Sequence, residues 1–212
     1  MQNNMIQPLL DPNPVIYDES NMGSISFKQS LDLLMDPEEY SKFIRNIEST
    51  FRKSRFYKDY KASIMNNGIS YDQQMKNINS EMANIEMHHH LPTLKDACII
   101  LTEYLLKTTN QVNTFSVLRL IENLHRMNMF GMIMLTTTNH QVYHSDPSSF
   151  ISITQLYGNP IGFLNLFHKF FTVDIAYKWL LQFKQEEQYN NLSNWPGMAN
   201  GRKILLDWSN IL

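Results

Sequence analysis

The spacing of apolar residues predicts a mostly helical chain. After Asp36-Pro37, an apolar residue recurs every three or four positions as far as Phe51, which is the period of one helix face. Aspartate caps a first turn and proline fits the first helical position, so we expect a helix that begins there and continues to about Met65. The tripeptide Asn66-Asn67-Gly68 would end this helix.

Two short strand-like segments stand in the middle of the chain, at residues 84–91 and 130–135. Pro92 closes the first segment, because proline cannot donate a ladder hydrogen bond. Between the two segments, the apolar pattern predicts helices at about 94–107 and 114–128. A short helix that carries two histidines follows the second strand.

The two ends of the chain complete the domain organisation. Closely spaced prolines predict an irregular lead over residues 1–24, and the C-terminal third predicts an extended segment followed by helices. We therefore expect three regions: an N-terminal irregular lead and basic helical region at 1–83, a core at 84–146 with a helical insertion at 93–128, and a C-terminal helical extension at 147–212.

Composition narrows the function classes. The chain has 212 residues, and 18 basic against 20 acidic residues leave a net charge of −2, which excludes a globally basic nucleic-acid coat. The single cysteine, Cys98, excludes an internal disulfide and a multi-cysteine zinc site. No apolar run approaches the roughly 18 residues of a membrane span, and the first residues lack the pattern of a signal peptide. We expect a cytoplasmic protein with no membrane partner.

Positive charge concentrates on the first predicted helix, where aromatic residues are interleaved with it. This arrangement is typical of a helix that follows nucleic-acid phosphates, and a solvated helix face is the alternative interpretation. The residues predicted to contact nucleic acid are Arg45, Arg52, Lys53, Arg55, Lys58 and Lys61.

Six of the seven histidines lie between positions 88 and 144. His140 and His144 are four residues apart, so on a helix they share one face and can bind one metal ion. His88 and His89 are adjacent near the end of a predicted strand, where neighbouring side chains face opposite sides. Both can serve one site only if the strand ends or distorts there, as the nearby Pro92 suggests. Strand, strand and helix occur here in the order of a ββα metal fold.

The histidine segments resemble two motifs of HNH endonucleases. Residues 86–92 read Glu-Met-His-His-His-Leu-Pro and resemble the first motif, Glu-x-His-His-x-x-Pro. Residues 134–144 resemble the last motif, in which a strand runs into a helix bearing His-x-x-x-His. The chain is also similar to HNH-like proteins of tailed phages, through these motifs and the segment Val112 to Val117.

The resemblance implies a role for each motif residue. His88, His140 and His144 would be the ligands of a single divalent metal ion (Zn, Ni, Mn or Mg), and His89 would be the general base that activates water. Glu86 would orient an imidazole from the second coordination shell. Phosphodiester hydrolysis needs such a base near neutral pH and a cation beside the phosphate.

The chain departs from the HNH pattern in three places. Thr136 and Asn139 occupy the positions of a frequent Cys-x-x-Cys pair, so we expect packing to replace a zinc knuckle. Gly131 stands where the middle asparagine is usual, and Asn128 is the nearest substitute. The two-helix insertion also lengthens the gap between the motifs. His125, at the end of that insertion, is either a site residue or a partly buried structural histidine.

These observations predict an α+β, mostly helical fold, with a ββα-metal core, a two-helix insertion between its strands, a long N-terminal helix and C-terminal helices. The function expected is a metal-dependent HNH-type endonuclease that hydrolyses DNA, encoded by a phage and active in the host cytoplasm. The alternative is a non-catalytic protein of the same fold, a nucleic-acid-binding or structural subunit of a phage complex. DNA is the expected partner, beside a protein partner or a second copy. The insertion itself suggests a further alternative, a helix-turn-helix DNA reader.

Overall fold

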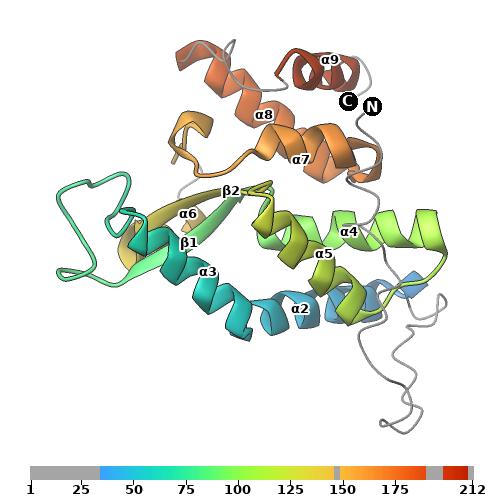
Figure 1. Cartoon of the computed structure of the whole chain (residues 1–212). Coiled ribbons are helices and arrows are strands. Elements are labelled where there is room, and N and C mark those ends of the chain that lie inside the picture. The colour runs from blue at the N-terminus through green and yellow to red at the C-terminus, as the bar shows by residue number, and fades with distance from the viewer. Residues whose placement is uncertain (1–33, 146–148, 190–197, 210–212) are drawn as a thin grey trace, which may run out of the picture.

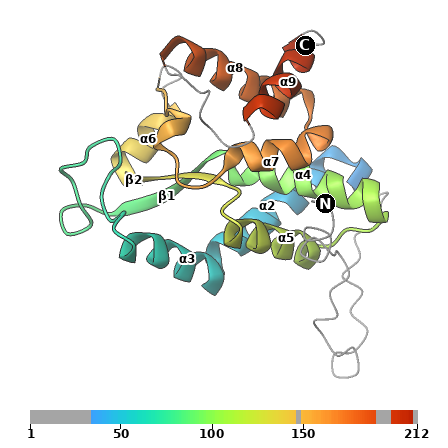
Figure 2. The same ribbon diagram turned by 45° about the horizontal axis from the view of Figure 1, so that its top comes forward.

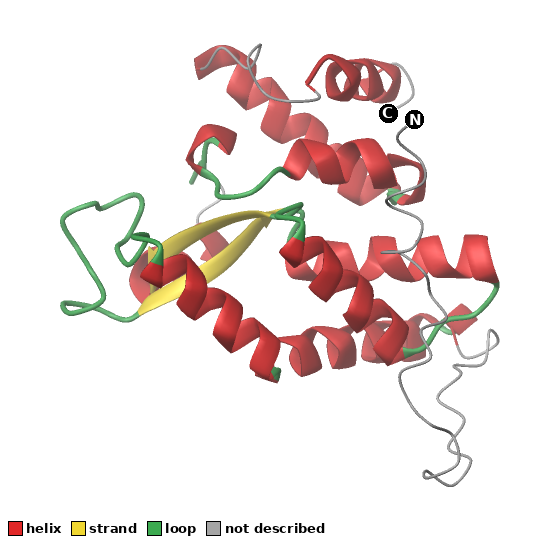
Figure 3. Cartoon of the chain, in the orientation of Figure 1, coloured by secondary structure: helices red, strands yellow, loops and turns green. Residues whose placement is uncertain are grey.

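The computed structural model describes residues 34–145, 149–189 and 198–209, and it shows helices arranged around a two-stranded sheet (Figures 1 and 3). This arrangement confirms the expected mostly helical α+β fold. The irregular lead predicted for residues 1–24 lies outside the described ranges.

The sheet consists of β1 (Ile85–Leu91) and β2 (Gly131–Thr136), paired antiparallel. His88 pairs with Ile133, and the regular register is interrupted only between His89 and Leu91. All six residues of β2 are buried, which is typical of a strand covered on both faces. Helix α6 (Thr137–Ser145) follows β2 directly and packs against both strands.

The insertion between the strands forms two helices, α4 (Leu94–Thr109) and α5 (Thr114–Arg126), close to their predicted bounds. Each helix begins at a side-chain cap that satisfies a free backbone amide: Thr93 for α4 and Asn113 for α5. The two helices pack against each other and against α2, so the insertion is part of the main core.

The single helix expected from Asp36 to about Met65 is two helices, α2 (Pro37–Lys53) and α3 (Arg55–Asn66). Ser54 separates them, because its backbone is extended at φ −64° and ψ 152°. Its hydroxyl accepts a hydrogen bond from the Tyr57 amide and thereby caps the new helix. The apolar spacing of the first helix stops at Phe51, since Ser54 and Arg55 hold the next two positions of that face, and apolar residues resume at Phe56.

The C-terminal part is helical and covers the side of the sheet opposite α2 and α3 (Figures 1 and 2). It contains η1 (Ile153–Gln155), α7 (Pro160–Phe167), η2 (His168–Phe170), α8 (Val173–Tyr189) and α9 (Met198–Ser209). The segment expected to be extended at 150–156 therefore contains a short 3₁₀ helix. Within the described ranges, no helix has both the length and the apolar character needed to cross a membrane.

Candidate metal centre

Three imidazoles come together where β1 lies beside α6. His88 comes from the strand, while His140 and His144 lie one turn apart on the helix. One ligand nitrogen from each of the three lies within 4.8 Å of the other two. The Nε2 atoms of His140 and His144 are 3.0 Å apart. Imidazole nitrogens about 2.0–2.1 Å from a zinc ion and in tetrahedral geometry lie roughly 3.3 Å from one another, so small side-chain shifts would complete this ligand set.

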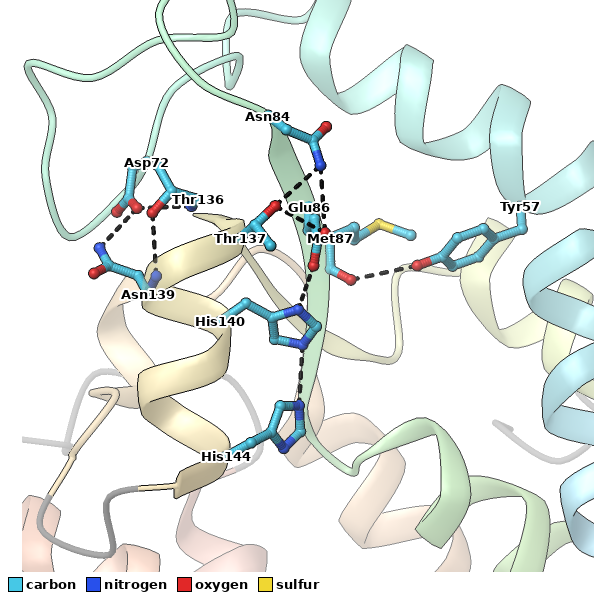
Figure 4. Close-up of polar contacts among 10 residues, drawn as sticks. All are labelled: Tyr57, Asp72, Asn84, Glu86, Met87, Thr136, Thr137, Asn139, His140 and His144. Atoms are coloured by element: carbon cyan, nitrogen blue, oxygen red, sulfur yellow. Dashed lines mark hydrogen bonds and ion pairs between the residues drawn. The ribbon is translucent and has the colours of Figure 1, made fainter.

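Glu86 fixes the orientation of one of these imidazoles. Its Oε2 atom lies 2.5 Å from Nδ1 of His140, while its Oε1 atom accepts a hydrogen bond from the Thr137 hydroxyl (Figure 4). Asn84 donates to both Glu86 and Thr137. With the Nδ1 proton held by the carboxylate, Nε2 of His140 keeps its lone pair directed toward the other two histidines.

The electrostatic environment favours neutral His88 and His144 and a charged Glu86. Burial, reinforced by the neighbouring imidazoles, lowers the pKa of His88 to about 3, and burial also lowers the pKa of His144. Burial alone would raise the pKa of Glu86, but hydrogen bonds from His140 and Thr137 hold it below its ordinary value. Neutral imidazole is the form that binds metal, so His88 and His144 are in the binding form at neutral pH.

His89, the expected general base, points to the opposite side of β1. Its side chain is 3% exposed, and its Nε2 lies 2.8 Å from Nε2 of His125. The ring packs between Tyr57 and Phe130. The structure therefore places His89 in the core, away from the three clustered histidines.

The His89–His125 pair has a defined hydrogen-bond direction. Nδ1 of His125 lies 2.7 Å from the carbonyl of Ile121, so it carries the proton and its Nε2 is the acceptor. Nε2 of His89 must then be the donor, which leaves Nδ1 of His89 as a buried acceptor without a hydrogen-bond partner. Of the two interpretations of His125, the structure supports a buried structural histidine.

Asn128 is also remote from the cluster. It occupies the turn before β2 in the left-handed region, at φ 52°, and its side-chain oxygen accepts a hydrogen bond from the Tyr60 hydroxyl. Gly131, at the expected position of the middle asparagine, pairs with Leu91 at the far end of β1. The described structure thus brings together Glu86 and the three expected ligands, but neither His89 nor Asn128.

His90 lies on the same face of β1 as His88, with ring centroids 6.1 Å apart. Its Nε2 is 3.1 Å from the Gln182 side-chain oxygen on α8. This contact attaches α8 to β1, the strand that carries His88. Gln182 also donates a hydrogen bond to the Ile151 carbonyl. The side chain of His90 is held by these contacts beside the cluster.

The predicted basic residues lie along α2 and α3, and most of them are exposed. Arg52 pairs with Glu48 at 2.9 Å and Arg55 with Asp59 at 3.3 Å. Arg52 nevertheless lies close enough to lower the pKa values of His88 and His144, and Lys61 helps to lower that of Glu86. The others, Arg45, Lys53 and Lys58, are exposed on the same two helices.

Asp72 is a key polar residue of this region that the sequence did not indicate. Its Oδ2 accepts hydrogen bonds from the Thr136 amide and the Asn139 side chain, both at 2.7 Å (Figure 4). Its Oδ1 accepts from the amides of Gln74 and Met75. Thr136 and Asn139 are the positions of the absent cysteine pair, so a buried carboxylate, rather than packing alone, stabilises the start of α6.

Comparison with known proteins identifies the family. The searches of curated proteins and of solved structures gave no significant match. No match indicates the HNH endonucleases that the histidine motifs resemble. A family model, described as bacteriophage G278-like virion protein, matches residues 6–196 and supports a phage origin. Since this match covers nearly the whole sequence, the chain belongs to the bacteriophage G278-like virion protein family.

Proposed function

We propose that this virion protein is a non-catalytic structural subunit of the phage particle, in which His88, His140 and His144 hold one divalent metal ion. The observation that carries the proposal is the convergence of three imidazoles from β1 and α6, with one ligand nitrogen of each within 4.8 Å of the others. A bound ion would join the helix to the strand and stabilise the folded chain, because metal-binding free energy adds to folding free energy.

The donor set favours particular ions. Imidazole nitrogens suit zinc, nickel and copper, whereas magnesium prefers oxygen ligands. Zinc or nickel is therefore the best candidate among the ions considered. Glu86 supports such a site because a carboxylate that holds the distal imidazole proton makes the ligand nitrogen more basic.

Metal-dependent DNA hydrolysis is the second candidate function. Arg52 and Lys61 bring positive charge to the cluster, and this charge suits a phosphodiester. General-base catalysis, however, needs a base within hydrogen-bond reach of the attacking water. His89 lies on the other face of β1, in the buried pair with His125, so the geometry favours the non-catalytic function.

Metal content tests the leading proposal. The purified chain would be stripped with a chelator, incubated with zinc, dialysed and analysed by mass spectrometry for bound metal. We expect one zinc per chain, and we expect His140→Ala to lose it. His168→Ala is the matched control, because His168 lies in η2 and belongs to no part of the cluster. Wild-type protein without zinc, or a His140→Ala variant with full zinc content, would refute the metal centre.

DNA assays separate the two candidate functions. We expect no nicking of supercoiled plasmid by zinc-, nickel-, manganese- or magnesium-loaded protein. Nicking that disappears in His140→Ala would instead establish the nuclease. DNA binding itself is tested with the double variant Arg52→Ala and Arg55→Ala: weaker binding with a smaller salt dependence would identify the basic helices as the contact surface. Unchanged binding would exclude that surface.

A further inference from the structure

One face of α8 carries apolar side chains to the surface. Val173, Tyr177 and Leu181 are 67%, 51% and 42% exposed. They follow one another at intervals of four residues, so they form a stripe along the helix. The opposite face, with Ile175, Trp179 and Phe183 among others, is buried in the core. Clustered exposed apolar side chains of this kind are typical of a protein–protein contact.

The residues around the stripe have the spacing of a helix-pairing seam. Asp174, Tyr177, Leu181 and Lys184 follow one another at intervals of three, four and three residues. This is the spacing of the a and d positions through which two helices pack. The two apolar residues occupy the middle of the seam, an acid occupies its N-terminal end and a base its C-terminal end.

The seam is complementary to itself when two copies run antiparallel. By their spacing, Asp174 and Leu181 occupy a positions, while Tyr177 and Lys184 occupy d positions. In an antiparallel pair, each a position faces a d position of the other helix. Asp174 then faces Lys184 of the second copy, and Tyr177 faces Leu181 of the second copy. A two-fold axis repeats both contacts, as in a closed dimer in which one surface patch binds its own copy. A parallel pair would place each charged residue beside its like-charged equivalent and is therefore disfavoured.

The flank of the seam is compatible with this pairing. Lys178 lies beside the two-fold axis, where two lysines would approach each other. Its ammonium group, however, is 2.9 Å from Asp96 of its own chain, which offsets the charge. Helix α8 also lies, together with α9, in the outer layer of the molecule farthest from α2 and α3, where a second copy has access (Figures 1 and 2).

We propose that two copies of this chain associate through an antiparallel, two-fold pairing of α8, with Tyr177 and Leu181 at its centre and Asp174–Lys184 ion pairs at its ends. The pairing does not depend on the metal centre.

Sedimentation equilibrium of the full chain tests the proposal. The expected wild-type species has twice the 25.0 kDa mass of one chain. We expect Leu181→Glu to produce a monomer. Val142→Glu is the matched control, because Val142 has the same 42% exposure on α6 and should leave the dimer intact. A wild-type monomer at all concentrations would overturn the proposal, as would a dimer that Leu181→Glu leaves unchanged while its circular dichroism shows a folded chain.

Charge exchange tests the antiparallel arrangement. Asp174→Lys and Lys184→Asp should each weaken the dimer about tenfold or more, because each substitution places like charges opposite one another twice. The double variant with both substitutions should regain the wild-type dissociation constant, and an equimolar mixture of the two single variants should form mixed dimers. A double variant no tighter than either single variant would refute the antiparallel pairing.

Discussion

His88 and His89 are neighbours in the sequence, yet their imidazoles lie on opposite faces of β1. His88 faces His140 and His144, with ring centroids 4.8 and 5.2 Å away. His89 faces the core and lies 2.8 Å from His125. One histidine thus belongs to the three-imidazole cluster, while the other belongs to the buried core.

Substitution of these two neighbours should have opposite effects. We expect His88→Ala to weaken zinc binding by more than about 100-fold, since even the loss of a ligand's supporting partner costs up to that amount. We expect His89→Ala to keep zinc affinity but to lower the free energy of unfolding by about 2–4 kcal/mol, because it leaves a cavity and an unpaired histidine. Calorimetric zinc titration and urea unfolding would measure the two effects. Loss of zinc binding in a folded His89→Ala variant would contradict this division of roles.

Glu86 should tune the affinity of the metal centre without binding the ion itself. Glu86→Gln removes the negative charge opposite Nδ1 of His140, so we expect about 10-fold weaker zinc binding. Calorimetric titration at pH 7.5 would measure it. Glu81→Gln, a similar change at an exposed residue before β1, is the control and should leave the affinity unchanged. Equal affinities for Glu86→Gln and wild type would remove Glu86 from the site.

Asp72 should contribute strongly to stability because four hydrogen-bond donors converge on its buried carboxylate. We expect Asp72→Asn to lower the free energy of unfolding by about 2–3 kcal/mol, since the amide group opposes backbone N–H donors. Asp59→Asn removes an exposed partner of Arg55 and should cost less than about 1 kcal/mol. Urea unfolding of both variants at pH 7 measures the difference. Similar losses in the two variants would show that Asp72 has no special role.

The buried His125 should make the metal-free chain sensitive to acid. Burial lowers its pKa to about 4 from an ordinary value of 6.5. Between these values the unfolded chain binds more protons than the folded chain, so stability is full above pH 6.5 and falls as the pH decreases toward 4. One such group predicts a loss of about 2 kcal/mol between pH 6.5 and 5.

The variant His125→Gln tests this assignment. It removes one titrating group, so its free energy of unfolding should fall less steeply than that of wild type over the same pH range. Urea unfolding of both proteins at several pH values, with a chelator present, would show the difference in slope. Parallel pH profiles would mean that other groups cause the acid sensitivity.

Much of the architecture could be predicted from local patterns. The two strands, the two helices between them and the short helix with His140 and His144 depend on spacing and on side chains near in sequence. The break at Ser54 was not predicted, because a polar interruption of one turn is also compatible with a continuous helix, and only the Ser54 hydroxyl marks the start of the new one.

The site was predictable only where it depends on such spacing. Two side chains four residues apart on a helix must share a face, which is why the His140–His144 pair could be predicted. The expectation for His89 required β1 to distort between His88 and His89, but the irregular pairing follows His89 and leaves the alternation intact. Asp72 acts across 64 residues on Thr136, a contact that no local pattern encodes.

The measurement that tests the central claim most directly is zinc X-ray absorption spectroscopy of the loaded wild-type chain. The account predicts a fine structure dominated by three imidazole nitrogens at about 2.0–2.1 Å from zinc. It also predicts one fewer imidazole, or loss of the ion, in His144→Ala. A shell dominated by sulfur or by carboxylate oxygens, or a spectrum that His144→Ala does not change, would contradict the His88–His140–His144 metal centre.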